Sequence, residues 1–368
     1  MDQDVKSMGA TSSNPREKHE ALGEDSLPQP VQQRNVLQEK QKGLFYRFYL
    51  RLCEVAIVLS IVLSAISIFS EREESSLQRL RGHFSCSKAG QDYKITYIAI
   101  PGFFKQDKSS ADPDKIGPAP DRFGLIDHHK HYWTNFDKKI QKLNKKSDSD
   151  TSYKVLFLGR HGEGFHNVGM DYYGQDEWDR KWGRKNGNGT ITWGPDAQLT
   201  DRGVAQAERV HSLWQKELTR GGGIPLPTAF FVSPLIRALH TFQITFAGIV
   251  DDPEPLIIEN LRDSYGLRTA DLRHNKTWIR EQYPTYRFED GFTEQDELWM
   301  KDERETDEHT EKRVRGVLDK ILTIEDTYLA IVAHSKVVEA TFNITKHQDF
   351  DVPTGGMAVD VSAPNPSR

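Results

Sequence analysis

Short hydrophobic runs alternate with amphipathic segments along most of the chain. Runs rich in β-branched and aromatic residues predict strands at residues 93–100, 153–158, 229–232, 256–258, 328–333 and 357–361. Apolar residues every three or four positions predict helices at residues 201–218, 235–249, 306–323 and 336–345. Thr200 is the predicted N-cap of the first of these helices. This order predicts an α/β fold, a three-layer α/β/α sandwich with a mostly parallel central sheet.

The predicted domain covers residues 92–368, with one interruption of its strand and helix alternation. Residues 269–305 mix charged and aromatic side chains without a clear period. Long irregular segments between regular elements often carry binding residues. We therefore predict a lid or insertion at residues 269–305.

The N-terminal quarter of the chain has a different pattern. Residues 1–43 are polar and hold almost no aromatic side chains, so we predict that they are disordered. Residues 44–70 include a run of 15 without a charge, at 55–69, and apolar positions surround the whole predicted helix. This favours a single transmembrane anchor over a buried amphipathic helix, with residues 71–91 as a polar linker. Lysine and arginine counts leave the membrane side of the domain open, and a cytoplasmic protein is the alternative.

Composition narrows the chemistry. The net charge of -5 is small for 368 residues and no large basic stripe is present, which argues against a nucleic-acid partner. Two cysteines, Cys53 and Cys86, are too few for a disulfide framework or a cysteine-rich zinc site. Any catalysis must therefore come from histidine, arginine and carboxylate side chains.

The strongest local motif is Arg160-His161-Gly162-Glu163, directly after the predicted strand 153–158. In α/β sheets, ligands bind beyond the carboxyl ends of the strands. An arginine presents a planar fork that suits phosphate oxygens, and a histidine can attack phosphorus. Taken alone, the motif is equally compatible with an exposed Arg-His pair in a turn.

Two further strand ends carry similar residues. Arg237 falls in the first turn of the helix that follows strand 229–232, where a helix N-terminus already favours an anion. His334 follows strand 328–333. Each residue alone could be a solvated arginine or a satisfied core histidine. Three strand ends that deliver these side chains to one edge of a sheet favour a functional site.

Five ordered blocks together resemble the histidine phosphatase superfamily, in its phosphoglycerate mutase-like branch. They are LGRHGEGFHN at 158–167, DAQLTDRG at 196–203 with Gln206-Ala207, SPLIRA at 233–238, LRD at 261–263 with Gly266, and VAHS at 332–335. The resemblance spans residues 93–345. Ordered blocks at compatible spacing are far more specific than the RHG tripeptide.

The resemblance implies a role for each matching position. His161 would be the nucleophile, phosphorylated on a ring nitrogen. The phosphate pocket would be formed by Arg160, Arg237 and His334, and Asn167 would be a further donor. His334 would also take part in catalysis. Fixed cationic donors neutralise the charge that gathers on a phosphoryl group during transfer. No metal and no cofactor is expected.

The resemblance also implies a carboxylic acid that protonates the leaving oxygen. Asp263 stands at the matching position, where the family has a glutamate with one more methylene. Glu259, four residues earlier, could replace it if the segment is turned or helical. Reach to the leaving oxygen decides between the two acids.

Three functions remain open from the sequence. We expect a metal-independent phosphomonoester hydrolase that acts on a small phosphorylated metabolite. A phosphoglycerate mutase-type transfer is the alternative with the same site, and Arg262, Arg268 and Arg273 could then bind a substrate carboxylate. A non-catalytic, membrane-anchored module that binds phosphorylated ligands is the alternative of another class. The oligomeric state is left open.

Overall fold

The computed structural model describes residues 95–148 and 151–366 of the chain. All of them lie in the second of the two units into which the chain divides, residues 83–368. The predicted disordered segment 1–43, membrane anchor 44–70 and linker 71–91 lie outside the described residues. Among the helices of the described ranges, none combines the length and the apolar character that a membrane crossing requires. The anchor stays a prediction.

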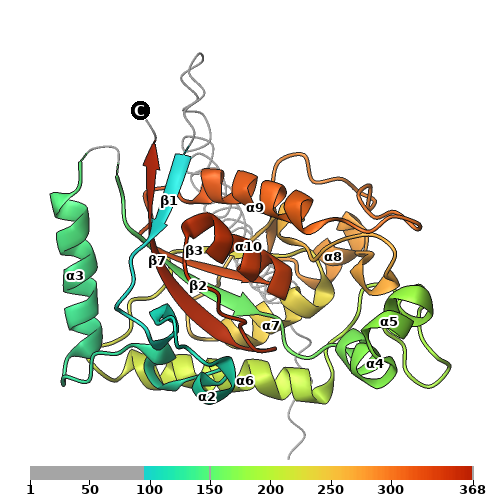
Figure 1. Ribbon diagram of the computed structural model, residues 1–368, viewed down its shortest axis with the longest axis horizontal. Coiled ribbons are helices and arrows are strands. Elements are labelled where there is room, and N and C mark those ends of the chain that lie inside the picture. Colours follow the sequence, from blue (N-terminus) through green and yellow to red (C-terminus); the bar gives the residue numbers. More distant parts are fainter. Residues whose placement is uncertain (1–94, 149–150, 367–368) are drawn as a thin grey trace, which may run out of the picture. The chain divides into compact units, whose positions relative to one another are not determined.

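A seven-stranded sheet forms the centre of the described unit, in the order β1-β7-β2-β6-β3-β4-β5 (Figure 1). In the part of the sheet with the order β2-β6-β3-β4-β5, all neighbouring strands are parallel. Strand β7 is antiparallel to both β2 and β1. The α/β fold predicted from the sequence is confirmed. The strands are β1 (Ile95–Ala99), β2 (Lys154–Arg160), β3 (Ala229–Val232), β4 (Leu256–Ile257), β5 (Arg287–Phe288), β6 (Tyr328–Ala333) and β7 (Met357–Pro366).

Helices connect the strands and cover the sheet, with α6 along one side and α9 along the other in Figure 1. The predicted N-cap is confirmed, because the Thr200 side chain accepts a hydrogen bond from the backbone N–H of Gly203. The helices are α2 (Pro113–Ile116), α3 (Tyr132–Lys146), α4 (Phe165–Tyr173), α5 (Gln175–Glu177), α6 (Asp201–Leu218), α7 (Ile236–Phe246), α8 (Lys276–Gln282), α9 (Asp307–Ile321) and α10 (Ser335–Thr345).

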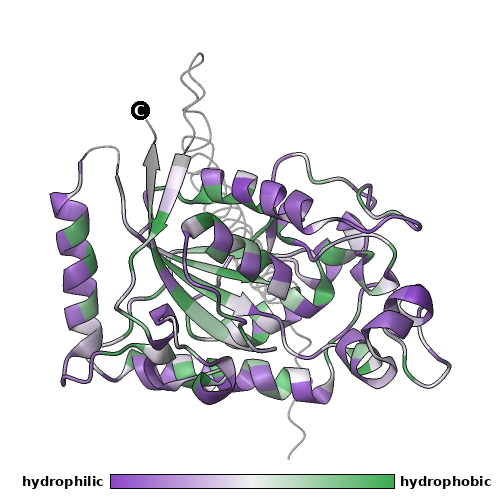
Figure 2. Cartoon of the chain, in the orientation of Figure 1, coloured by the Kyte–Doolittle hydropathy of each residue, from purple (hydrophilic) through white to green (hydrophobic). Residues whose placement is uncertain are grey.

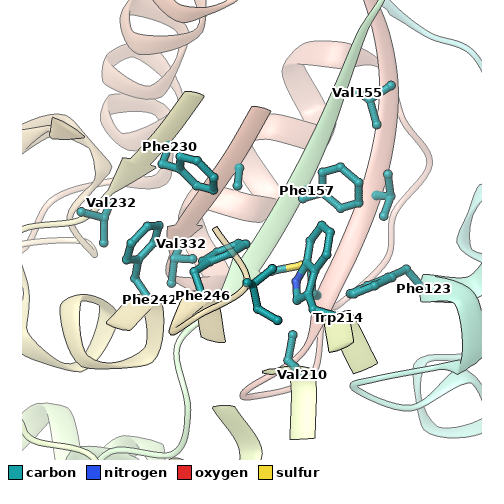
Figure 3. Packing of buried hydrophobic residues seen from close by; sticks show 14 of the residues in the cluster. Phe123, Val155, Phe157, Val210, Trp214, Phe230, Val232, Phe242, Phe246 and Val332 are labelled. Carbon is teal, nitrogen blue, oxygen red and sulfur yellow. The ribbon is translucent and has the colours of Figure 1, made fainter. Parts of the chain in front are cut away.

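Alternate residues of β2 face two separate cores. Phe157 belongs to a cluster with side chains of α3, α6 and α7, whereas Leu158 belongs to a cluster with α9 and α10. In the first cluster Trp214 of α6 lies 4.8 Å from Phe123 and 4.9 Å from Phe157 between ring centroids (Figure 3). Hydrophobic residues accordingly gather on the central strands, while α3 and α5 are largely polar (Figure 2). A strand buried on both faces explains the continuous apolar run that predicted β2.

Some elements were not expected from the sequence. Helix α3 buries only Trp133, Phe136 and Ile140, and its remaining residues are mostly charged or polar. The two-residue strand β5 comes from the segment 269–305 and pairs with β4. This segment therefore extends the edge of the sheet, and α8 also lies within it. Its action as a lid stays a prediction.

Candidate active site

The site lies where three parallel strands end side by side. Arg160 at the end of β2 is in register with Ala333 at the end of β6, and Val232 of β3 is in register with Val332. The backbone N–H of His161 donates to the carbonyl of Ala333 at 3.0 Å. The strand pairing therefore fixes the spacing of the segments that begin at 160, 233 and 334.

His161 is nearly enclosed, with 2% of its surface exposed. Its Nδ1 lies 2.7 Å from the carbonyl oxygen of Gly162. Because a carbonyl only accepts, we assign the ring proton to Nδ1, which leaves the Nε2 lone pair for a reaction. Burial, with the charges of Arg237 and Arg160, lowers the pKa of His161 to about 3. The imidazole is therefore neutral at neutral pH, which is the state that the predicted nucleophile requires.

His334 and Asp263 lie beside His161. The two imidazole centroids are 5.0 Å apart, and His334 Nδ1 lies 3.6 Å from Asp263 Oδ2. A ring nitrogen of His161, a ring nitrogen of His334 and a carboxylate oxygen of Asp263 all lie within 4.8 Å of one another. Three ligands of a metal ion would have the same spacing. The positive charges of Arg237 and Arg160 beside His161 disfavour a cation there and favour an anion.

Arg237 is fully buried in the first turn of α7. Its Nη2 donates to Asp263 at 3.1 Å and to Asp271 at 2.8 Å, and its Nη1 donates to the carbonyl of Ala270 at 2.8 Å. Its Nε has no hydrogen-bond partner. The guanidinium is thus held firmly and still has a donor available.

The other two predicted phosphate ligands are held by neighbouring backbone. Arg160 Nη1 donates to the carbonyl of Val352 at 2.9 Å, and its Nε has no hydrogen-bond partner. Asn167 uses its Oδ1 to accept from the backbone N–H of Gly164 at 2.9 Å, at the start of α4. Within residues 95–148 and 151–366, no hydrogen bond or ion pair joins Asn167 to His161, so its role as a phosphate donor stays a prediction.

The structure separates the two candidate acids. Asp263 contacts Arg237 and faces His334, as described above. Glu259 is instead held by Arg262 at 2.9 Å and by Arg273 at 2.8 Å. Burial raises the pKa of Asp263, but Arg237 and Arg304 outweigh it and hold the value at about 2. Asp263 is the acid that reaches the site, and it is ionised while it pairs with Arg237.

Comparison with known proteins agrees with this arrangement. The sequence profile of the histidine phosphatase superfamily (branch 1) matches residues 156–351. The chain belongs to this superfamily. The match includes every predicted site residue, from Arg160 to His334. A histidine phosphatase of this kind is an enzyme of the phosphatase or mutase type.

Relatives of this histidine phosphatase carry mutase names. It is 37% identical over 280 residues to a "Probable phosphoglycerate mutase" of Arthroderma benhamiae, which covers 72% of this chain and 83% of that protein. It is 29% identical over 290 residues to a "Probable phosphoglycerate mutase" of Saccharomyces cerevisiae, with 72% of this chain and 96% of that protein covered. A putative alpha-ribazole-5'-P phosphatase from Escherichia coli is a more distant solved structure, at 18% identity and a TM-score of 0.36 over 56% of this chain and 90% of that one.

Sequence reasoning gave no role to three groups around the histidine phosphatase site. Asp271 bridges Arg237 and Arg304. Asp196 accepts from the backbone N–H of Ile236 at 3.0 Å, next to Arg237. His166 lies 5.4 Å from His161 between ring centroids. In the sequence, the only indication that Asp196 and His166 lie near the site is that both belong to blocks that resemble the family.

Proposed function

We propose that this histidine phosphatase hydrolyses phosphomonoesters of small metabolites through a phosphohistidine on Nε2 of His161, without a metal or a cofactor. Arg160, Arg237 and His334 bind the phosphoryl oxygens, and Asn167 adds a further donor. Asp263 protonates the leaving oxygen. The observation that carries this proposal is the meeting of His161, Asp263 and His334 within 4.8 Å beside the guanidinium of Arg237.

Unpartnered nitrogens support the phosphate-binding roles. Arg160 Nε, Arg237 Nε and His334 Nδ1 are buried without a hydrogen-bond partner. The His334 ring is oriented so that its Nε2 meets the hydroxyl of Ser233 at 2.7 Å. If that hydroxyl donates to Nε2, Nδ1 carries the proton. A buried donor without an acceptor costs about 1–3 kcal/mol, and phosphoryl oxygens are suitable acceptors for all three.

The acid role of Asp263 requires substrate binding. In the free site its pKa of about 2 keeps the carboxylate ionised. A phosphoryl group places negative charge beside Asp263 and competes with it for Arg237. Both effects raise the pKa of the carboxyl group, because a nearby like charge disfavours ionisation. Asp263 then carries the proton that the departing oxygen needs.

Hydrolysis is favoured over mutase transfer by the state of three arginines. A mutase holds the substrate carboxylate, for which Arg262, Arg268 and Arg273 are the sequence candidates. The side chains of Arg262 and Arg273 are 0% exposed and ion-paired. Arg268 is paired with Asp179 at 2.6 Å. These pairings occupy all three candidates, although the names of the relatives keep mutase transfer as the second candidate.

Turnover by the full-length protein tests the proposal. The wild type should release phosphate from p-nitrophenyl phosphate, and His161→Ala should lose about 1000-fold or more in kcat, since a nucleophile has been removed. Wild type quenched in alkaline detergent should carry radioactive phosphate on His161 after reaction with a labelled substrate, because the P–N bond is labile in acid and stable in alkali. Equal activity of wild type and His161→Ala would refute the mechanism. Interconversion of phosphoglycerates faster than phosphate release would establish the mutase alternative.

Membrane attachment through residues 44–70 is a separate part of the proposal, supported by the sequence pattern alone. Alkaline carbonate extraction of cell membranes tests it. Retention of the full-length chain in the pellet, with release of a chain that lacks residues 44–70, is the expected result. Release of both chains would leave the cytoplasmic alternative.

A further inference from the structure

Thr241 is a buried threonine of α7 to which the mechanism above gives no role. It lies one helical turn after Arg237, and 4% of its surface is exposed. Its hydroxyl donates to the carbonyl of Arg237 at 2.7 Å and accepts from the backbone N–H of Gly162 at 3.0 Å. Because a carbonyl oxygen only accepts, the hydroxyl proton belongs to the bond with Arg237, and an oxygen lone pair receives the N–H of Gly162. One side chain thus joins the helix of Arg237 to the residue that follows His161.

The peptide bond between His161 and Gly162 is held on both of its polar sides. The backbone N–H of Gly355 donates to the carbonyl of His161 at 2.8 Å. Thr241 accepts from the N–H of Gly162, as described above. The carbonyl of Gly162 in turn accepts from Nδ1 of His161 at 2.7 Å, in the tautomer assigned above. Gly162 therefore connects Thr241 to the imidazole, and a shift of Gly162 would turn the ring that carries Nε2.

Packing against α6 supports the same loop in a different way. A Cβ at Gly162 would lie 2.3 Å from the carbonyl oxygen of Gly203, so the two backbones are in close contact. This contact limits how near the loop comes to α6, but it is steric and sets no direction. A hydrogen bond does set a direction, because it weakens steeply when it is misaligned. The bond to Thr241 therefore orients the loop relative to α7, the helix that carries Arg237.

The relative placement of His161 and Arg237 matters because both act on one phosphoryl group in the proposed reaction. Burial, and then the charge of Arg237, lower the pKa of His161, so the guanidinium is close to the imidazole. The bond from Nε2 to phosphorus forms while the bond to the leaving oxygen breaks, and that oxygen takes the electron pair and the proton of Asp263. In-line attack requires that the guanidinium hold the phosphoryl oxygens at a fixed angle to Nε2.

We propose that Thr241 is a positioning residue, which fixes Nε2 of His161 relative to the guanidinium of Arg237 for attack on phosphorus. This inference rests on the proposed function. Thr241 transfers no proton and binds no substrate in this role. It holds the nucleophile and the cation in one arrangement before the substrate arrives. Its loss should therefore slow the phosphorylation of His161 more than it weakens substrate binding.

Rapid-quench kinetics of the full-length protein with labelled p-nitrophenyl phosphate, quenched in alkaline detergent, test this role. Thr241→Val keeps the shape of the side chain and removes the hydroxyl. It should slow the formation of phosphohistidine about 10-fold to 100-fold, with a smaller change in KM. Thr241→Ser keeps the hydroxyl and should restore most of the rate. Thr241→Ala removes the same hydroxyl from a smaller side chain and should repeat the loss.

Thr341 of α10 provides the matched control. It is fully buried, and its hydroxyl donates to the carbonyl of Val337, four residues earlier, at 2.8 Å. In the part of the chain that the structure describes, the Thr341 hydroxyl makes no second hydrogen bond. Thr341→Val therefore removes the same kind of bond within a helix without touching the His161 loop. It should keep the wild-type rates, and thermal unfolding shows what each substitution does to stability.

The background of Arg237→Ala separates positioning from a general loss of stability. The cation to be aligned is missing there, so Thr241→Val should cost less in rate than it does in the wild type. An equal loss in both backgrounds, wild-type rates in Thr241→Val, or the same loss in Thr341→Val overturns the role of Thr241. Absence of labelled phosphohistidine in the wild type overturns the proposed function instead.

Discussion

Arg237 and Asp271 form a buried pair in which Nη2 lies 2.8 Å from Oδ1. The other oxygen of the same carboxylate lies 2.7 Å from Nη1 of Arg304. Asp271 thus fixes the orientation of the guanidinium that we place at the phosphoryl group. In the proposed reaction it acts through Arg237, as a positioning residue.

Substitution of this carboxylate should slow catalysis more than it weakens binding. Asp271→Asn keeps the size and one acceptor but loses a charge that holds two arginines. A small misplacement of a substrate-orienting group can cost about 100-fold in rate. We expect kcat with p-nitrophenyl phosphate to fall about 10-fold to 100-fold, with a smaller change in KM. Asp349→Asn at an exposed position is the control, and equal kcat values for the two variants would contradict the positioning role.

The role of Asp263 predicts a dependence on the leaving group. Alkyl phosphates need a proton on the departing oxygen, whereas p-nitrophenolate leaves without one. Asp263→Asn should lower kcat/KM about 100-fold or more for an alkyl phosphate, within the usual range for a lost general acid, and far less for p-nitrophenyl phosphate. Glu259→Gln should change both substrates alike, because Glu259 pairs with Arg262 and Arg273. A selective loss in Glu259→Gln would assign the acid there instead.

The sequence predicted most of this site because its residues follow strands. The register of β2 with β6 brings Arg160 next to Ala333. Period and composition place the end of β6 at Ala333, as observed, and the end of β2 at residue 158, two residues before Arg160. The Arg237–Asp271 pair could not be predicted in this way, since its partners are 34 residues apart and one lies in an irregular segment. Strand β5 could not be predicted from the sequence for a related reason. Two residues are too few for a period, and only pairing with β4 makes them a strand.

Asp196 predicts a pH dependence of stability. It is 2% exposed, and burial raises its pKa from 3.8 to about 7. Between these values the folded protein holds a proton that the unfolded chain has lost, so stability falls as the pH rises from about 4 to 7. Three pKa units correspond to at most about 4 kcal/mol. The free energy of unfolding in urea should differ less between pH 5 and pH 7.5 for Asp196→Asn than for the wild type, because asparagine cannot ionise. An equal difference for the variant would assign the pH dependence to other groups.

Close backbone contact between α6 and the His161 loop predicts the effect of one methyl group. A Cβ at Gly203 would lie 2.1 Å from the carbonyl oxygen of Glu163, and no rotamer relieves a clash between backbone atoms. Gly203→Ala must therefore shift the start of α6 or the loop that carries His161. We expect a loss of about 1–3 kcal/mol in stability, as for other overpacked sites, together with a lower kcat.

Gly316 in the interior of α9 provides the matched control for Gly203→Ala. A Cβ there would meet nothing within 4 Å. Gly316→Ala should stabilise the protein by about 0.5–1 kcal/mol, because alanine loses less backbone entropy than glycine in a helix. Thermal unfolding and p-nitrophenyl phosphate turnover of the two variants measure both effects. If Gly203→Ala behaved like Gly316→Ala, the contact between α6 and the loop would not be what holds His161 in position.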